Sequence, residues 1–229
     1  MKIALTQSEG RLAGLAAALT ECGHEVVRQP LIRTEPLGDD EVRGRAAQLL
    51  GCAWLLFSSP NAVEAWRALG LPLREIRPKV GVVGAKTARA IRTFGGDVSL
   101  IGEPQNAEGL ADTFLEQEVE GTVGLPRGER SLETLQARLE AHNIQTFPVT
   151  IYKTVTCPWT SEAVDTVVLA SPSAAGALPE RVGGRVKLIS LGPSTSAAIA
   201  KRGWRCVQAE APSAEAVLKL FMTFGKEVA

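Results

Sequence analysis

Four short segments of this 229-residue chain carry residues that begin helices and could hold anions. Two are Ser-Pro steps, at residues 59–60 and 171–172, and two are Gly-x-x-Thr steps, at residues 84–87 and 192–195. A Ser or Thr oxygen can cap free backbone N–H groups, and proline fits the first helical position. Helix starts attract anions through these N–H groups and the helix dipole. The four segments therefore predict local binding of several negative charges.

An apolar run of strand length precedes each start, and such runs alternate with helical patterns along the chain. The predicted strands are residues 2–5, 25–29, 53–58, 80–83, 98–101, 122–126, 145–148, 166–170 and 187–191. The predicted helices are residues 11–22, 62–69, 87–94, 109–117, 132–141 and 195–202, with Asn106 as a cap. This alternation indicates an α/β protein with parallel sheets, in which the helix starts follow the carboxyl ends of strands.

The elements repeat in the order short unit, long unit, short unit, long unit. The strand-helix-strand unit of residues 2–29 returns at 122–148, and the longer unit that starts at residue 53 returns from residue 166. Repeat order alone suggests two successive domains with a boundary near Gly121. Polar, proline-containing linkers near residues 33–40 and 153–160 instead favour a chain that crosses between two lobes.

Composition excludes several classes of partner. Lys plus Arg (25) balance Asp plus Glu (25), so no broad basic field indicates nucleic acid or an anionic membrane as a partner. Apolar runs fall short of the roughly 20 residues of a membrane span, and no signal-peptide pattern precedes the first strand, so we expect a cytoplasmic protein. The four cysteines have no Cys-x-x-Cys spacing, which indicates reduced thiols and no metal site.

In this order and spacing, the motifs resemble the uroporphyrinogen-III synthase family over nearly the whole chain. The matching segments are residues 57–63, 83–88, 126–130, 149–154, 171–173 and 191–195. The resemblance implies an α/β fold of two parallel-sheet lobes joined by a two-stranded linker, with the chain crossing between lobes twice. Residues 1–35 plus 160–229 would then form one lobe, and residues 38–152 the other.

The resemblance also implies an enzyme of haem and porphyrin biosynthesis. The family's reaction closes the linear tetrapyrrole hydroxymethylbilane to uroporphyrinogen III, with loss of water and inversion of ring D. It implies a monomeric, cofactor-independent hydro-lyase whose small-molecule substrate carries eight carboxylates, with no metal, nucleic acid or membrane as partner. A transient contact with the preceding enzyme of the pathway is the one macromolecular contact left open.

Tyr152 is the only tyrosine, and it matches the family's tyrosine beside the second crossing. It is therefore the candidate general acid that helps expel water; the alternative is a half-buried hinge residue whose hydroxyl is satisfied locally. The predicted substrate-binding residues are Ser58, Ser59, Asn61, Ala85, Lys86, Thr87, Arg127, Ser171, Ser173, Lys187, Pro193, Ser194 and Thr195.

Each of these residues also has a purely structural interpretation. The hydroxyls can bind substrate or only cap their own helices, and Arg127 can bind a carboxylate or pair with a nearby glutamate. Lys187 matches a basic position of the family, or is a solvated strand end. Asn61 stands where some relatives carry arginine, so binding there depends more on backbone groups.

Two other classes of function fit parts of the pattern. A non-catalytic, two-lobed binding module could close on a polyanionic small ligand, and Tyr152 is the residue that favours catalysis over this alternative. A nucleotide or sugar-phosphate enzyme is the third class, but the chain has no Gly-x-Gly-x-x-Gly or Walker loop.

Overall fold

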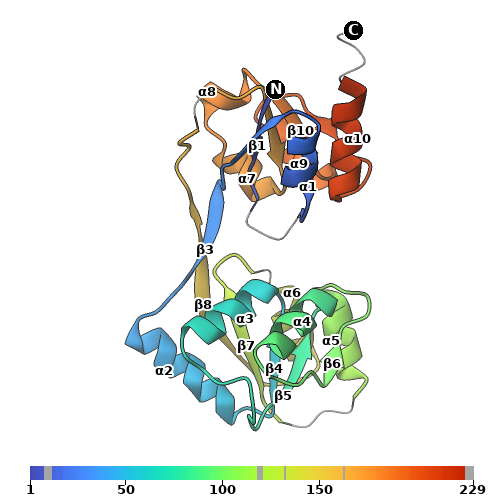
Figure 1. The fold of residues 1–229 in the computed structure, drawn as a ribbon. Coiled ribbons are helices and arrows are strands. Elements are labelled where there is room, and N and C mark those ends of the chain that lie inside the picture. Colours follow the sequence, from blue (N-terminus) through green and yellow to red (C-terminus); the bar gives the residue numbers. More distant parts are fainter. Residues whose placement is uncertain (8–11, 118–120, 132, 162, 225–229) are drawn as a thin grey trace. The chain divides into compact units, whose positions relative to one another are not determined.

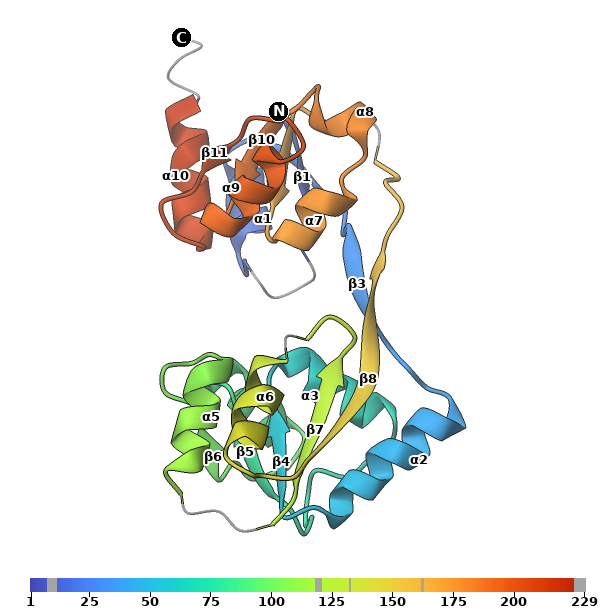
Figure 2. The same ribbon diagram turned by 180° about the vertical axis from the view of Figure 1, so that it is seen from behind.

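The computed structural model describes residues 1–7, 12–117, 121–131, 133–161 and 163–224, which form two compact units (Figures 1 and 2). Unit 1 consists of Met1–Arg33 and Val155–Ala229, and unit 2 consists of Thr34–Thr154. The chain therefore enters unit 2 from unit 1 and returns. The alternative of two successive domains with a boundary near Gly121 is wrong.

Unit 2 is built on a six-stranded sheet in the order β3-β8-β7-β4-β5-β6. The pairs β8/β7, β7/β4, β4/β5 and β5/β6 are parallel, as the alternation of strands and helices predicts. Its strands are β3 (Ile32–Pro36), β4 (Trp54–Phe57), β5 (Lys79–Val82), β6 (Leu100–Ile101), β7 (Val123–Gly128) and β8 (Thr146–Thr156). Its helices are α2 (Asp40–Gln48), the 3-10 turn η1 (Leu49–Gly51), α3 (Pro60–Ala68), α4 (Ala85–Thr93), α5 (Ala107–Leu115) and α6 (Thr134–Ala141).

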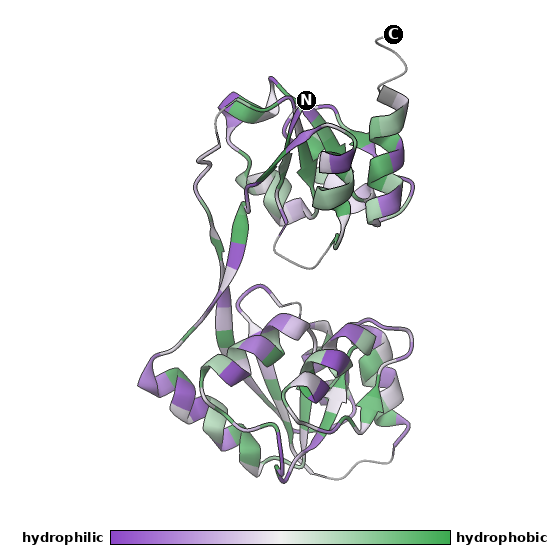
Figure 3. Ribbon diagram, in the orientation of Figure 1, coloured by the Kyte–Doolittle hydropathy of each residue, from purple (hydrophilic) through white to green (hydrophobic). Residues whose placement is uncertain are grey.

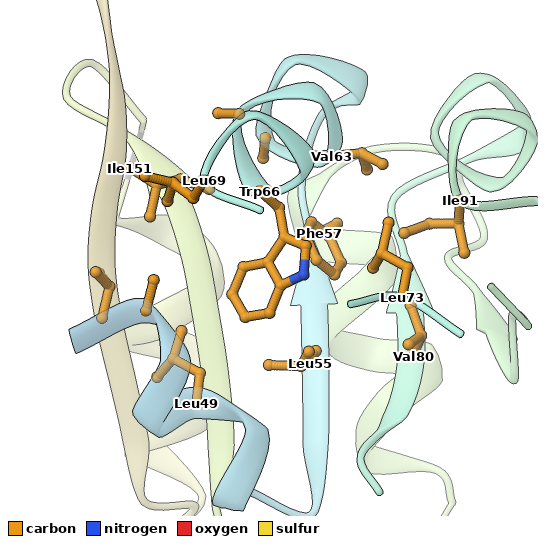
Figure 4. Packing of buried hydrophobic residues seen from close by; sticks show 14 of the residues in the cluster. Leu49, Leu55, Phe57, Val63, Trp66, Leu69, Leu73, Val80, Ile91 and Ile151 are labelled. Atoms are coloured by element: carbon orange, nitrogen blue, oxygen red, sulfur yellow. The ribbon is translucent and has the colours of Figure 1, made fainter. Parts of the chain in front are cut away.

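The apolar run of β4 is buried on both faces of this sheet, which is why it shows no polar alternation. Leu55 and Phe57 pack with α2, α3 and α4, where Trp66 lies edge-on to Phe57 with ring centroids 5.8 Å apart (Figure 4). Trp54 and Leu56 instead pack with α5 and α6 on the other face. The sheet is thus a central layer between two layers of helices.

Unit 1 has a fully parallel five-stranded sheet in the order β11-β10-β9-β1-β2. Its strands are β1 (Lys2–Leu5), β2 (Glu25–Arg28), β9 (Thr166–Leu169), β10 (Lys187–Ser190) and β11 (Val207–Gln208). Its helices are α1 (Leu15–Glu21), α7 (Pro172–Ala177), α8 (Glu180–Gly183), α9 (Pro193–Ala200) and α10 (Ala214–Phe224). Helices α1 and α10 cover one face and α7 and α9 the other, so hydrophobic residues line the central strands (Figure 3).

The two units share one plan, which confirms the internal repeat. From one edge, β2-β1-β9-β10-β11 of unit 1 corresponds to β8-β7-β4-β5-β6 of unit 2. Unit 1 therefore combines the first short unit with the second long unit, and unit 2 combines the first long unit with the second short one. Each short unit therefore shares a sheet with the long unit of the other repeat, and the order of the repeats in the sequence does not reveal this exchange.

Several boundaries differ from the sequence-based prediction. Helix α1 begins at Leu15 and not at residue 11, because Gly14 adopts a left-handed conformation with φ of 86°. The first expected linker, residues 33–40, contains most of the strand β3. Helix α2 begins at the last residue of this linker, and Asp39 caps it by accepting a hydrogen bond from the Val42 N–H at 2.8 Å. The second expected linker is partly strand too, since β8 extends to Thr156. Residues 11 and 132, expected as helix starts, lie outside the described residues.

Candidate active site

All four predicted helix starts follow the carboxyl ends of parallel strands, β4 and β5 in unit 2 and β9 and β10 in unit 1. Ser59 Oγ accepts a hydrogen bond from the Ala62 N–H at 3.2 Å and thereby caps α3. Ser171 Oγ accepts from the Ala174 N–H at the same distance and caps α7. The Ser-Pro steps are thus N-caps, and their hydroxyls are already engaged by their own helices.

The Gly-x-x-Thr starts use their residues differently. No side chain of the helix itself caps α4 or α9, and Gly84 and Gly192 are extended. Thr87 and Thr195 are buried, with 1% and 3% of their surface exposed, so their hydroxyls face the protein interior. What these starts offer a ligand is therefore backbone N–H groups.

Gln105 occupies the start of α4, which the sequence did not indicate. The Ala85 N–H donates to Gln105 Oε1 at 3.1 Å. A Cβ at position 84 would lie 2.4 Å from that oxygen, so glycine is needed for the close approach. The sequence predicts the neighbouring Asn106 as a cap, and it does accept from the Gly109 N–H at 2.8 Å, but no pattern marks Gln105. An amide oxygen thus lies where a carboxylate oxygen would bind.

Tyr152 lies at the end of the unit 2 sheet where the helices begin, and a local irregularity between β7 and β8 holds it there. The register of β7 with β8 shifts between Arg127 and Gly128, so that Gly128 pairs with Tyr152 and Ile151 is the extra residue. Such a bulge redirects side chains. The Tyr152 ring lies over Gly128, where an added Cβ would be 2.4 Å from its Cζ atom.

The Tyr152 hydroxyl lies 3.1 Å from Ser59 Oγ, at the start of α3. The residue is 9% exposed, so its ring belongs to the core while its oxygen reaches the polar edge. Ser59 Oγ accepts from the helix and can still donate its own hydrogen to the phenol oxygen. In that arrangement the phenolic hydrogen is free to point at a bound molecule.

The remaining predicted residues divide into those near these helix starts and those that lie elsewhere. The first group belongs to the segments that begin the four helices: half-buried Ser58 and the exposed Asn61, Ala85, Lys86, Ser173, Pro193 and Ser194. Arg127, near the carboxyl end of β7, donates to Gln136 Oε1 of α6 at 3.0 Å. Lys187 begins β10, so within unit 1 it lies at the opposite end of that strand from the helix start at Pro193.

Comparison with known proteins agrees with this architecture. A family model described as uroporphyrinogen-III synthase (HemD) matches residues 13–219. A mutant uroporphyrinogen III synthase from Thermus thermophilus has a similar crystal structure, with a TM-score of 0.61, 18% identity and 99% of each chain covered. The uroporphyrinogen-III synthetase structure from Helicobacter pylori gives a TM-score of 0.66 and 18% identity, covering 97% of this chain and 99% of that one.

No curated protein sequence matches the chain. Among the residues that the structure describes, no helix is long and apolar enough to cross a membrane. Within the same residues, no three His, Cys, Asp or Glu side chains gather as a group that could hold a metal ion.

Proposed function

The chain belongs to the uroporphyrinogen-III synthase family, and from this we propose that it cyclises hydroxymethylbilane to uroporphyrinogen III without a cofactor. The observation that carries the proposal is the Tyr152 hydroxyl at the start of α3, 3.1 Å from Ser59 Oγ, in a chain whose family match spans residues 13–219. Family membership does not favour the alternative of a non-catalytic binding module. A cytoplasmic location and a transient contact with the enzyme that supplies the bilane belong to the same proposal.

The substrate's carboxylates bind, in this proposal, at the starts of α3 and α4 of unit 2. A role for the start of α9, in unit 1, stays a prediction. Each exposed helix start stabilises an anion by about 0.3 to 1 kcal/mol, and more where it is partly buried. At α4 a carboxylate oxygen replaces the exposed Gln105 amide at the Ala85 N–H, and Lys86 adds a positive charge. Roles for Arg127, Lys187, Ser171 and Ser173 stay predictions.

Tyr152 supplies a proton to the departing hydroxyl group. The phenolic O–H bond breaks as the carbon–oxygen bond of the hydroxymethyl group breaks, which releases water and leaves a phenolate and a cationic bilane. Ring closure then returns one proton from the reacting pyrrole ring to the phenolate. Donation from Ser59 to the phenol oxygen stabilises the negative charge that develops there.

The test is an isomer assay. Freshly prepared hydroxymethylbilane is given to the purified protein, and the products are oxidised and separated as type I and type III isomers. We expect type III to dominate, whereas spontaneous closure gives the symmetric type I isomer. Dominance of type I at saturating protein would refute the synthase function and leave the binding module.

The acid role has its own variant. General acids typically contribute ~10²-fold or more to a rate, so Tyr152→Phe should lower kcat at least about tenfold while KM changes little. Ser213→Ala is the control, because it removes a serine cap with the same 3.2 Å geometry, at the Ala216 N–H, and lies outside the predicted binding residues. Wild-type turnover by Tyr152→Phe would reduce Tyr152 to a packing residue of the crossing strand.

A further inference from the structure

Unit 2 contains a cavity of about 460 Å³ that the proposed function does not use. It is lined by Arg45, Gln48, Leu49, Gly51, Cys52, Thr122, Phe147, Pro148 and Val149. These residues come from the end of α2, from η1, and from the amino-terminal ends of β7 and β8. Along β8, Val149 precedes Tyr152 by three residues, or about 10 Å at the usual rise of a strand. The cavity therefore lies at the opposite end of the sheet from the carboxyl ends that carry the helix starts.

The cavity has a firm apolar wall. Leu49 and Val149 are 3% and 5% exposed and belong to the core that also contains Trp66, so their positions are fixed by packing. Figure 4 shows Leu49 and Trp66 in this core. Cys52, 5% exposed, extends this wall as a small apolar side chain. Phe147 is 41% exposed, although it is one of the largest apolar side chains of the unit. A volume of this size and such a lining are typical of sites for small molecules.

One positive charge lies on this wall without a counterion. Arg45 is exposed and forms no hydrogen bond or ion pair with any residue that the structure describes, although Glu41 lies one turn earlier on α2. No carboxylate lines the cavity. The last turn of α2 favours a cation through the helix dipole, which explains the charge but not the exposed aromatic ring that lines the same cavity. A guanidinium binds a carboxylate through two parallel hydrogen bonds. Together, the two features match a molecule with one anionic end and an apolar body.

We propose that this cavity binds a small amphipathic monocarboxylate. Its carboxylate pairs with Arg45, and its flat apolar body lies against Phe147, Leu49 and Val149. The proposed substrate of the enzyme is a poor match, because one guanidinium cannot neutralise eight carboxylates. The cavity is therefore a second site, for a ligand of a different chemical class.

The test uses 2-naphthylacetate, titrated into the full-length protein and followed by amide NMR shifts. We expect saturable shifts in residues 45–52 and 147–149, whereas the neutral 2-naphthylacetamide should bind more weakly. Arg45→Gln should weaken naphthylacetate about threefold to fivefold, because an ion pair with an exposed guanidinium contributes up to about 1 kcal/mol. The same variant should leave the affinity for the amide unchanged. Arg43→Gln, on the same helix but outside the cavity, is the matched control and should stay within about twofold of wild type.

Phe147→Ser tests the apolar half of the site at a residue that is 41% exposed, and the amide spectrum of the variant shows directly whether unit 2 stays folded. Phe147→Ser should weaken both naphthalene ligands alike. The proposal is wrong if naphthylacetate gives no saturable shifts at millimolar concentration, or if Arg45→Gln binds it as wild type does. It is equally wrong if Phe147→Ser converts a dimer to a monomer in sedimentation while naphthylacetate leaves the spectrum unchanged, because the wall is then a self-association surface. Arg45→Gln should form the type III isomer normally, so the isomer assay separates this failure from that of the proposed function.

Discussion

The hydroxyl of Ser59 does two things at once, and the internal repeat supplies a control that does only one of them. Ser59 Oγ caps α3 and lies 3.1 Å from the Tyr152 hydroxyl, which belongs to a residue only 9% exposed. Ser171 Oγ caps α7 with the same 3.2 Å geometry but has no tyrosine partner. Ser59→Ala should therefore destabilise its unit more than Ser171→Ala destabilises the other.

The magnitudes follow from these contacts. Loss of a serine N-cap costs about 1 kcal/mol, which is the whole effect expected for Ser171→Ala. Ser59→Ala also removes the half-buried hydrogen bond to the Tyr152 hydroxyl, at about 0.5 to 1.5 kcal/mol, so its total is about 1.5 to 2.5 kcal/mol. Tyr152→Phe loses one hydrogen bond, or about 0.5 to 1.5 kcal/mol. Both single variants remove the same hydrogen bond, so the loss for the double variant should be smaller than the sum of the singles by about 0.5 to 1.5 kcal/mol.

Urea unfolding followed by ¹⁹F NMR of 5-fluorotryptophan protein measures each unit separately. Trp54 and Trp66 lie in unit 2, and Trp159 and Trp204 lie in unit 1, so the signals report the two transitions without further mutation. Additive losses for Ser59→Ala and Tyr152→Phe, within about 0.3 kcal/mol, would refute the hydrogen bond. A loss for Ser59→Ala no larger than that for Ser171→Ala would refute it as well.

Two further predictions concern groups outside the candidate site. Gln29 is 3% exposed, and its Oε1 accepts hydrogen bonds from the amides and hydroxyls of residues 160–161. Gln29→Met should therefore lower the free energy of unfolding of unit 1, measured in urea, by about 2 to 4 kcal/mol. Gln145 is exposed, so Gln145→Met should change the free energy of unfolding of unit 2 by no more than about 0.5 kcal/mol. A hydrogen bond from Thr146 lowers the pKa of the Glu140 carboxyl, so the stabilisation from this group is present above its unfolded pKa and lost as pH falls through the folded one. Thr146→Val should raise the Glu140 pKa toward its ordinary value in a ¹³C NMR titration, and an unchanged pKa would show that the hydrogen bond is absent.

The helix starts were readable from sequence because each depends on a few neighbouring residues. Ser59 and Ser171 cap the helices that they were expected to cap, since an N-cap bond spans only three residues. The sequence-based prediction does not include helix α2, although Asp39, Asp40 and Glu41 form an ordinary N-terminal signal, because the prolines and polar residues before them indicate a linker.

Features that depend on distant parts of the chain were not readable. The length of β8 comes from pairing with β7 and β3, which its own residues, with Pro148 among them, do not indicate. Gln105 reaches the start of α4 from 20 positions away, and the contact of Tyr152 with Ser59 spans 93 positions. The contact of Tyr152 with Ser59 depends on the order of the strands in the sheet, because β7 and β8 of the second short unit lie beside β4 of the first long unit.

The exchange of units between the repeats fixes the order in which the protein can fold during synthesis. Unit 2 is one continuous stretch of 121 residues (34 to 154 inclusive), whereas β1 of unit 1 lies between β2 and β9. The ribosome adds ~5 to 20 residues per second, so Thr166 follows Leu5, 161 positions earlier, by roughly 8 to 32 s. Unit 2 can complete its sheet in this interval, while β1 and α1 wait with Ile3 and Leu15 uncovered. The amino-terminal strand is therefore the segment most in need of a chaperone in the nascent chain.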